Sequence, residues 1–181
     1  MAAPGDLPKW DVYPIPSRRW ITTKYNTPAT QTISATFAVI GRTSISLIDI
    51  PFDCIIDRLC YQVGAAAAGN ARIGLYREGG TIDLPDGGTL VAESGSVAQP
   101  GTHRTVVNTL VPVEPMLTRG RYYVALQGDN ITGTAWFMFD SASNFGRYYD
   151  HAYGAFGNPC PVTVVSDRSP VVGLRIKKVL A

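Results

Sequence analysis

Short runs of alternating apolar and polar residues, each ended by glycine, proline or a charged pair, recur along most of this chain. Clear examples are QTISATFAVIG, TSISLIDIPF, CIIDRLCYQVG, ARIGLYRE and RYYVALQG. Side chains that alternate with a period of two lie on opposite faces of an extended strand. Strands of this length and spacing are typical of a β-sandwich or barrel, and no segment carries the apolar stripe of an amphipathic helix.

Glycine and proline content agrees with this periodicity. The chain has 18 glycines and 13 prolines, and only 17% of its residues are charged. Four alanines at 65–68 would suit a helix, but Gly64 and Gly69 bracket them and leave barely one turn. We expect a loop there, running into a strand. Because the chain lacks crossover connections, the sequence predicts antiparallel pairing and an all-β fold.

The first thirty residues differ from the rest. They contain five prolines and show no sustained periodicity, yet they keep several apolar residues. Proline fixes φ and removes a hydrogen-bond donor, which favours an extended conformation, and disordered tails are poor in aromatics. We therefore predict an extended arm over residues 1–30 that lies on a neighbouring molecule, rather than a disordered tail. Its predicted anchors are Trp10, Tyr13, Ile15 and Trp20.

Length and charge limit the possible partners. The remaining residues, 31–181, suit one domain with a real core. The chain has 16 basic and 14 acidic residues in mixed order, with a net charge of +2, so it lacks the basic stripe that nucleic-acid binding requires. No apolar stretch is long enough to cross a bilayer, and the N-terminus does not resemble a secretory signal. We expect synthesis in a cytoplasm and no nucleic-acid or membrane partner.

The three cysteines, Cys54, Cys60 and Cys160, lack the close spacing of zinc or redox motifs. We expect buried free thiols. Cys54 and Cys60 differ by an even number within one strand-like run, which predicts that they lie on the same face of that strand.

No catalytic or metal site is predicted. His103 lies in the turn QPGTHR, and His151 follows Asp150, but adjacent residues of a strand point to opposite faces and would not form a dyad. Acidic residues are scattered singly through loops rather than gathered as metal ligands, and the glycine-rich GGTIDLPDGG lacks a following helix. We expect no cofactor.

Aromatic residues are concentrated near the C-terminal third, in FGRYYDHAYGAF, which we expect to be a long loop or an irregular hairpin. Such residues can stack on sugar rings, fill the end of a sandwich or pack between subunits, and we favour the core or subunit explanation. The run from Trp136 to Phe139 is apolar throughout, so we expect a second subunit to cover one of its faces. The possible subunit or glycan contacts are Trp136, Phe145, Arg147, Tyr148, Tyr149, Asp150 and Tyr153.

The order of motifs resembles a β-sandwich domain of tailed-phage and prophage virion proteins. The motifs that carry the resemblance are IPFDCIIDRLCYQV, ARIGLYRE, TLVAESGSV and RGRYYVALQG, and it extends from about Thr32 to the C-terminus. The resemblance implies a non-enzymatic, often oligomeric building block of a tail fibre, a baseplate or a capsid surface. It implies no catalytic residues. The chain lacks a repetitive shaft, which favours a decoration or connector protein over a free-standing fibre.

These observations lead to one set of expectations. We predict an antiparallel β-sandwich of jelly-roll type with an N-terminal arm, which forms a homotrimer and attaches to other virion proteins of the capsid or tail. The alternative is a receptor-binding tail module that recognises a carbohydrate of the host surface.

Overall fold

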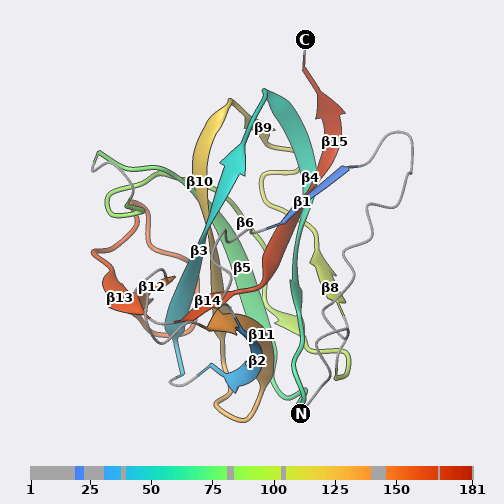
Figure 1. Cartoon of the computed structure of the whole chain (residues 1–181), viewed down its shortest axis with the longest axis vertical. Coiled ribbons are helices and arrows are strands. Elements are labelled where there is room, and N and C mark those ends of the chain that lie inside the picture. The colour runs from blue at the N-terminus through green and yellow to red at the C-terminus, as the bar shows by residue number, and fades with distance from the viewer. Residues whose placement is uncertain are drawn as a thin grey trace.

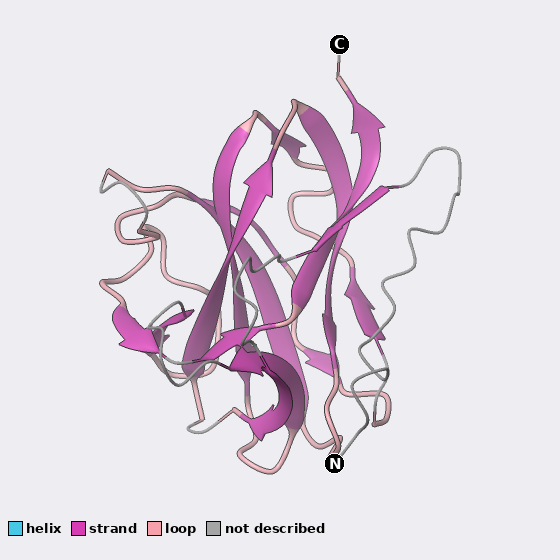
Figure 2. Ribbon diagram, in the orientation of Figure 1, coloured by secondary structure: helices cyan, strands magenta, loops and turns pink. Residues whose placement is uncertain are grey.

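The computed structural model describes residues 19–22, 31–37, 40–80, 84–102, 105–139, 146–166 and 168–180. In these ranges all regular structure is β-strand, and all strand pairs are antiparallel (Figures 1 and 2). The all-β prediction is therefore confirmed. The described segments include no helix of the length and hydropathy needed to cross a membrane.

Two large sheets build most of the described chain. The first sheet has the order β1-β15-β4-β8, with β9 also paired to β4. Its strands are β1 (Arg19–Thr22), β15 (Val172–Val179), β4 (Cys54–Gln62), β8 (Thr105–Asn108) and β9 (Met116–Leu117).

The second sheet has the order β13-β12-β3-β10-β5-β6, with β7 also paired to β5. Its strands are β13 (Val164–Ser166), β12 (Gly146–Asp150), β3 (Arg42–Ile50), β10 (Gly120–Gly128), β5 (Asn70–Arg77), β6 (Leu90–Glu93) and β7 (Val97–Ala98).

A third, smaller sheet lies at the lower end of the molecule in Figure 1, in the order β14-β11-β2. Its strands are β14 (Arg168–Pro170), β11 (Thr134–Phe139) and β2 (Gln31–Thr36). A bridge between Val63 and Ala135 joins this sheet to the end of β4. The hydroxyl of Ser169 on β14 donates a 2.7 Å hydrogen bond to Ser46 on β3, which joins it to the second sheet.

The main core lies between the two large sheets. Alternate residues of the facing strands are buried there, as the period-two pattern predicts. The largest contributions come from Ile48, Ile56, Leu59, Tyr61, Ile73, Leu75, Val124, Leu126, Leu174 and Ile176. This arrangement is that of an antiparallel β-sandwich. Strands that are distant in the sequence are neighbours in each sheet, for example β15 beside β4 and β10 beside β3. The jelly-roll type of the sandwich remains a prediction.

A β-bulge in β4 changes which residues face the core. Arg58 pairs with Arg175, whereas Ile56 pairs with Ile176, so Asp57 has no counterpart in β15. An extra residue in one strand reverses the alternation beyond it. Cys54 and Ile56 face the core before the bulge, and Leu59 and Tyr61 face it afterwards. Cys54 and Cys60 would share a face only in a continuous strand, and because the bulge interrupts the run they lie on opposite faces.

A second core covers the outer face of the seven-stranded sheet. Ile45, Tyr76, Tyr123 and Ala125 form its floor, and Tyr149, Phe156 and Cys160 complete it. Phe156 and Cys160 belong to residues 151–163, which connect β12 to β13 and which we call the strap. Because the strap covers this face, the central strands β5 and β10 are buried on both sides.

The predicted arm is described only at residues 19–22, as β1. This strand pairs with β15 of the same chain, from Arg19 opposite Ile176 to Thr22 opposite Gly173. Trp20 was predicted to anchor the arm on a neighbouring molecule, but its backbone belongs to the edge of its own domain's sheet. The other predicted anchors, Trp10, Tyr13 and Ile15, lie outside the described residues.

Candidate functional site

Exposed apolar side chains are concentrated at two sheet edges of the described structure. One group lies beside β4 and consists of Val111 (68% exposed), Val113 (75%) and Met116 (65%). The other group lies on and before the edge strand β13 and consists of Val162, Val164 and Val165. Single exposed apolar residues are ordinary on a protein surface, but contiguous groups mark surfaces that associate with a partner.

The first group is carried by residues 111–116, which we call the apolar loop. Val111 exchanges two backbone hydrogen bonds with Glu93, of 2.8 and 3.0 Å, and the carbonyl of Pro115 accepts a 3.2 Å bond from Ile56. The loop is therefore fixed at both ends. The strand β8 that precedes the loop ends at Asn108. Prolines at 112 and 115 are the sequence signal for this end, since proline disfavours a continuous paired strand.

The second group borders some of the predicted contact residues. Val164 lies opposite Tyr148, which is half-buried. The guanidinium of Arg42 lies 4.1 Å from the centre of the Tyr148 ring. Arg42 also forms a bidentate ion pair with Asp150, at 2.8 and 3.0 Å. The Arg42 hydrogen bond holds the pKa of Asp150 below its usual range. One face of the ring is thus already occupied by a cation, and that face is not free to stack on a sugar.

The predicted contact residues do not form one surface. Tyr149 is buried, and its hydroxyl donates a 3.1 Å hydrogen bond to Tyr76, whose hydroxyl donates in turn to the carbonyl of Gly157 at 2.7 Å. The assignment of Tyr149 as a subunit or glycan contact is wrong, because alternation along β12 places its side chain beneath the strap of the same chain. Arg147, Tyr153 and Trp136 are half-buried, Asp150 is exposed, and Phe145 lies outside the described residues.

The expected irregular segment is more regular than predicted. Residues 146–150 form β12, which pairs with both β3 and β13. The aromatic residues that follow belong to the strap. Phe156 fills the second core, and this outcome agrees with the core explanation of the aromatic residues rather than with a sugar-binding surface.

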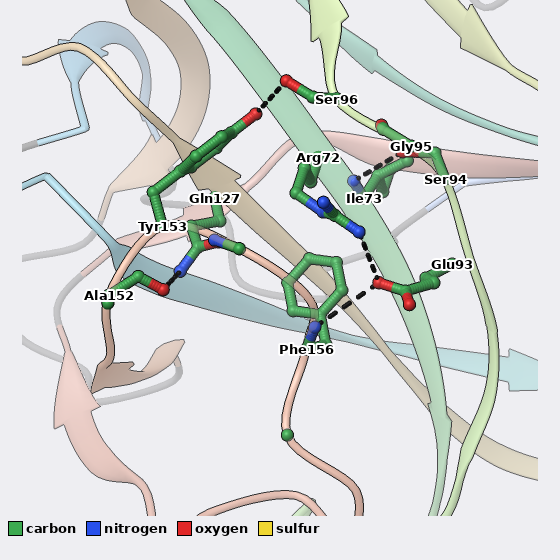
Figure 3. A network of polar contacts seen from close by, with 12 residues as sticks. Arg72, Ile73, Glu93, Ser94, Gly95, Ser96, Gln127, Ala152, Tyr153 and Phe156 are labelled. Atoms are coloured by element: carbon green, nitrogen blue, oxygen red, sulfur yellow. Dashed lines mark hydrogen bonds and ion pairs between the residues drawn. The ribbon is translucent and has the colours of Figure 1, made fainter.

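Polar contacts fasten the strap to the sheet, as Figure 3 shows. Glu93 forms a 3.1 Å ion pair with Arg72 on β5 and accepts a 3.4 Å hydrogen bond from the backbone of Phe156. The hydroxyl of Tyr153 lies 2.6 Å from that of Ser96. Gln127 donates to the carbonyl of Ala152 and accepts from Gly154. These residues hold a loop in place.

Acidic side chains in the described ranges all have partners in such contacts. Three pair with arginine at 3.1 Å or less, and the rest bind a lysine, a backbone amide or a neighbouring polar side chain, or lie within 4 Å of Arg121. The set comprises Asp49, Asp53, Asp57, Glu78, Asp86, Glu93, Glu114, Asp129 and Asp150. A general base or metal ligand requires a carboxylate that is available to substrate or metal. In these contacts the carboxylates hold strands and loops of the fold together.

The histidines and cysteines follow the same pattern where they are described. Nδ1 of His151 lies 2.8 Å from the carbonyl of Ala152, and Asp150 pairs with Arg42 instead of with this ring. His103 lies outside the described residues. The three cysteines are free thiols and are buried, as predicted. Burial raises the pKa of Cys54 to about 11 and that of Cys160 to about 12, which makes both thiols unreactive near neutral pH.

The described residues contain no group of histidine, cysteine and acidic side chains that could hold a metal ion. No protein-family model matches the chain, and no curated protein matches its sequence.

Proposed function

We propose that this protein is a non-enzymatic structural component of a tailed-phage particle, which associates with itself as a trimer and attaches to the capsid or tail. The observation that carries the proposal is the apolar loop. Its backbone is fixed, and its valine and methionine side chains are exposed, so covering them with a partner would lower the free energy of the protein in water. The engagement of the described carboxylates in ion pairs and hydrogen bonds between strands and loops favours a structural role over catalysis.

Two further features support the proposal. The strap packs on the outer face of the seven-stranded sheet, and the two groups of exposed apolar residues lie at sheet edges. The jelly-roll type that we predict for this sandwich is common in viral capsid proteins and in lectin domains. The resemblance of the sequence to virion proteins of tailed phages is the reason why we propose a phage particle as the location.

The proposal is tested by the mass of the full chain in solution. We expect a trimer by sedimentation velocity, and we expect the combined change Trp10→Ala, Tyr13→Ala and Ile15→Ala to shift the protein toward the monomer. Ile131→Asp, a change outside the segment before β1 and outside both groups of exposed apolar residues, serves as the control and leaves the trimer intact. A wild-type protein that remains monomeric at all concentrations would contradict the proposal.

A carbohydrate-binding tail module is the second candidate. Arg42 occupies one face of the Tyr148 ring, so a sugar would stack on the other face, next to the charged hydrogen-bonding groups of Arg42 and Asp150. A glycan array separates the two candidates. A sugar bound by the wild-type protein and lost in Tyr148→Ala would support this module, and Tyr153→Ala serves as the aromatic control.

A further inference from the structure

We propose that the apolar loop is the receptor for the N-terminal segment, residues 1–18, of a second copy of this chain. The inference rests on the proposed function, in which copies associate through that segment, and adds the surface that receives it. Four observations lead to it: the rigidity of the loop, the point at which the segment leaves the sheet, the residues of the segment, and the exposure of the loop in the single chain.

The loop presents its side chains in a fixed conformation. Besides the backbone bonds to Glu93 and Ile56, Glu114 forms an ion pair with Lys177 of β15. Glu114 also has a φ of 57°, in the left-handed region that residues other than glycine rarely adopt. Such strain persists where the surroundings fix the backbone, and it is concentrated at functional positions. A surface held in this way loses little conformational entropy when it binds a partner.

The N-terminal segment leaves the domain close to this loop. Arg19, the first residue of β1, lies opposite Ile176 on β15. The next residue of β15, Lys177, reaches Glu114 in the loop. The eighteen residues before β1 therefore join this strand at the same end of the sheet as the apolar loop. Copies that meet at this end bring one copy's segment to the other copy's loop.

The composition of the segment suits an exposed apolar receptor. It carries Leu7, Trp10, Tyr13 and Ile15 at short intervals, and prolines at 4, 8, 14 and 16. Tryptophan and tyrosine are the residues that most often dominate binding at interfaces. Proline restricts the free segment and so lowers the entropy lost on binding. The valine and methionine side chains of the loop offer the apolar surface that such anchors cover.

We assign the segment to a second copy, because the proposed function requires a contact between copies. The side chains of the loop are between 65% and 75% exposed and so offer surface for such a contact. A contact between a segment and a different surface is heterologous, and heterologous contacts close into rings when the rotation between copies permits. A ring of three copies, each covering the loop of the next, is the closed arrangement of this contact that agrees with the proposed trimer.

The first test measures association of full-length variants. Val113→Asp and Met116→Glu each place a charge on the apolar loop. We expect each to weaken association by about tenfold or more, because a side chain that the partner would bury in the complex becomes charged. Ile131→Asp is the matched control, since Ile131 is 52% exposed and lies in the loop between β10 and β11, outside both groups of exposed apolar residues. It should leave association unchanged. Equal weakening by Val113→Asp and Ile131→Asp would overturn the proposal.

The second test identifies the occupant and does not depend on those variants folding. A photoreactive phenylalanine analogue at position 116 of the full chain is cross-linked in a mixture of isotopically heavy and light copies. We expect linked peptides from residues 1–18, with heavy and light chains joined. Links confined to one chain, or links from position 116 to another part of the second copy, would overturn the proposal.

The two tests separate this inference from the proposed function. If the Trp10, Tyr13 and Ile15 variant dissociates while the Val113 and Met116 variants remain trimeric, the segment acts in assembly but its receptor lies elsewhere. If the wild-type chain is a monomer throughout, both proposals fail.

Discussion

The contact between Phe156 and Gly74 gives the sharpest test of how the strap is held. Phe156 is only 6% exposed and lies edge-on to Tyr76, with ring centres 6.4 Å apart. A Cβ atom added at Gly74 would lie 2.7 Å from Cδ2 and 2.9 Å from Cε2 of the Phe156 ring. Ordinary contact begins at about 3.4 Å, so Gly74→Ala forces the ring to move away from the strand.

The structure gives the magnitudes. Overpacking of a buried site costs about 1–3 kcal/mol, whereas alanine in place of glycine within a strand is favoured by about 0.5–1 kcal/mol. We therefore expect Gly74→Ala to destabilise the wild-type protein by about 1–2 kcal/mol. Phe156→Ala removes the ring and costs about 3–5 kcal/mol. In that background the Gly74→Ala change meets no ring and should be neutral or slightly stabilising, which gives a coupling energy of about 2 kcal/mol.

Urea unfolding of the four proteins in this double-mutant cycle measures the coupling. All samples are held at one protein concentration, because association shifts apparent stability. Hydrogen exchange of residues 151–163 provides a second measurement, and we expect Phe156→Ala to speed exchange in the strap more than in the main core. Additive effects of the two substitutions would refute the idea that the ring and the glycine are fitted to one another.

Three further predictions concern other contacts. Asp57→Asn should destabilise the fold by about 3–5 kcal/mol in urea unfolding, since it breaks a buried bidentate pair with Arg175 at 2.7 Å, and a smaller loss than for an exposed pair would contradict this. Asp150→Asn should cost about 1 kcal/mol or less, because the pair with Arg42 is exposed. As the pKa of folded Asp150 is lowered from 3.8, the wild-type advantage over Asp150→Asn should be present above about pH 4 and should disappear as the pH falls through the lower folded-state pKa. The three cysteines should react with a thiol reagent at pH 8 only as fast as the protein opens, and rapid modification of any of them in the native state would contradict their burial.

Strand positions were predictable where periodicity was local and strong. The alternation in ARIGLYRE predicts β5, and RYYVALQG predicts β10, because each half of the pattern packs against a different layer. Position 74 illustrates the limit of this reasoning. The sequence shows a glycine in a strand, but not that an aromatic ring eighty residues later needs the space.

The β-bulge in β4 and the covering of the seven-stranded sheet by the strap could not be predicted from the sequence. Asp57 lies in an apolar run, and its lack of a counterpart in β15 depends on the register of a strand more than a hundred residues away. One inserted residue reverses the faces beyond it, so the assignment of Cys60 failed even though the strand itself was correctly identified. The strap presents the same difficulty, because its aromatic residues show no period, and only the tertiary structure reveals that the sheet beneath them supplies their partners.

The pairing of β1 with β15 has a consequence for how the molecule is made. These strands stand at opposite ends of the described chain, yet they are neighbours in one sheet. During synthesis on the ribosome, β1 emerges more than a hundred residues before its partner β15. Contacts between residues so distant in sequence slow folding. The edge of this sheet is therefore completed only after the strands between β1 and β15 have been made.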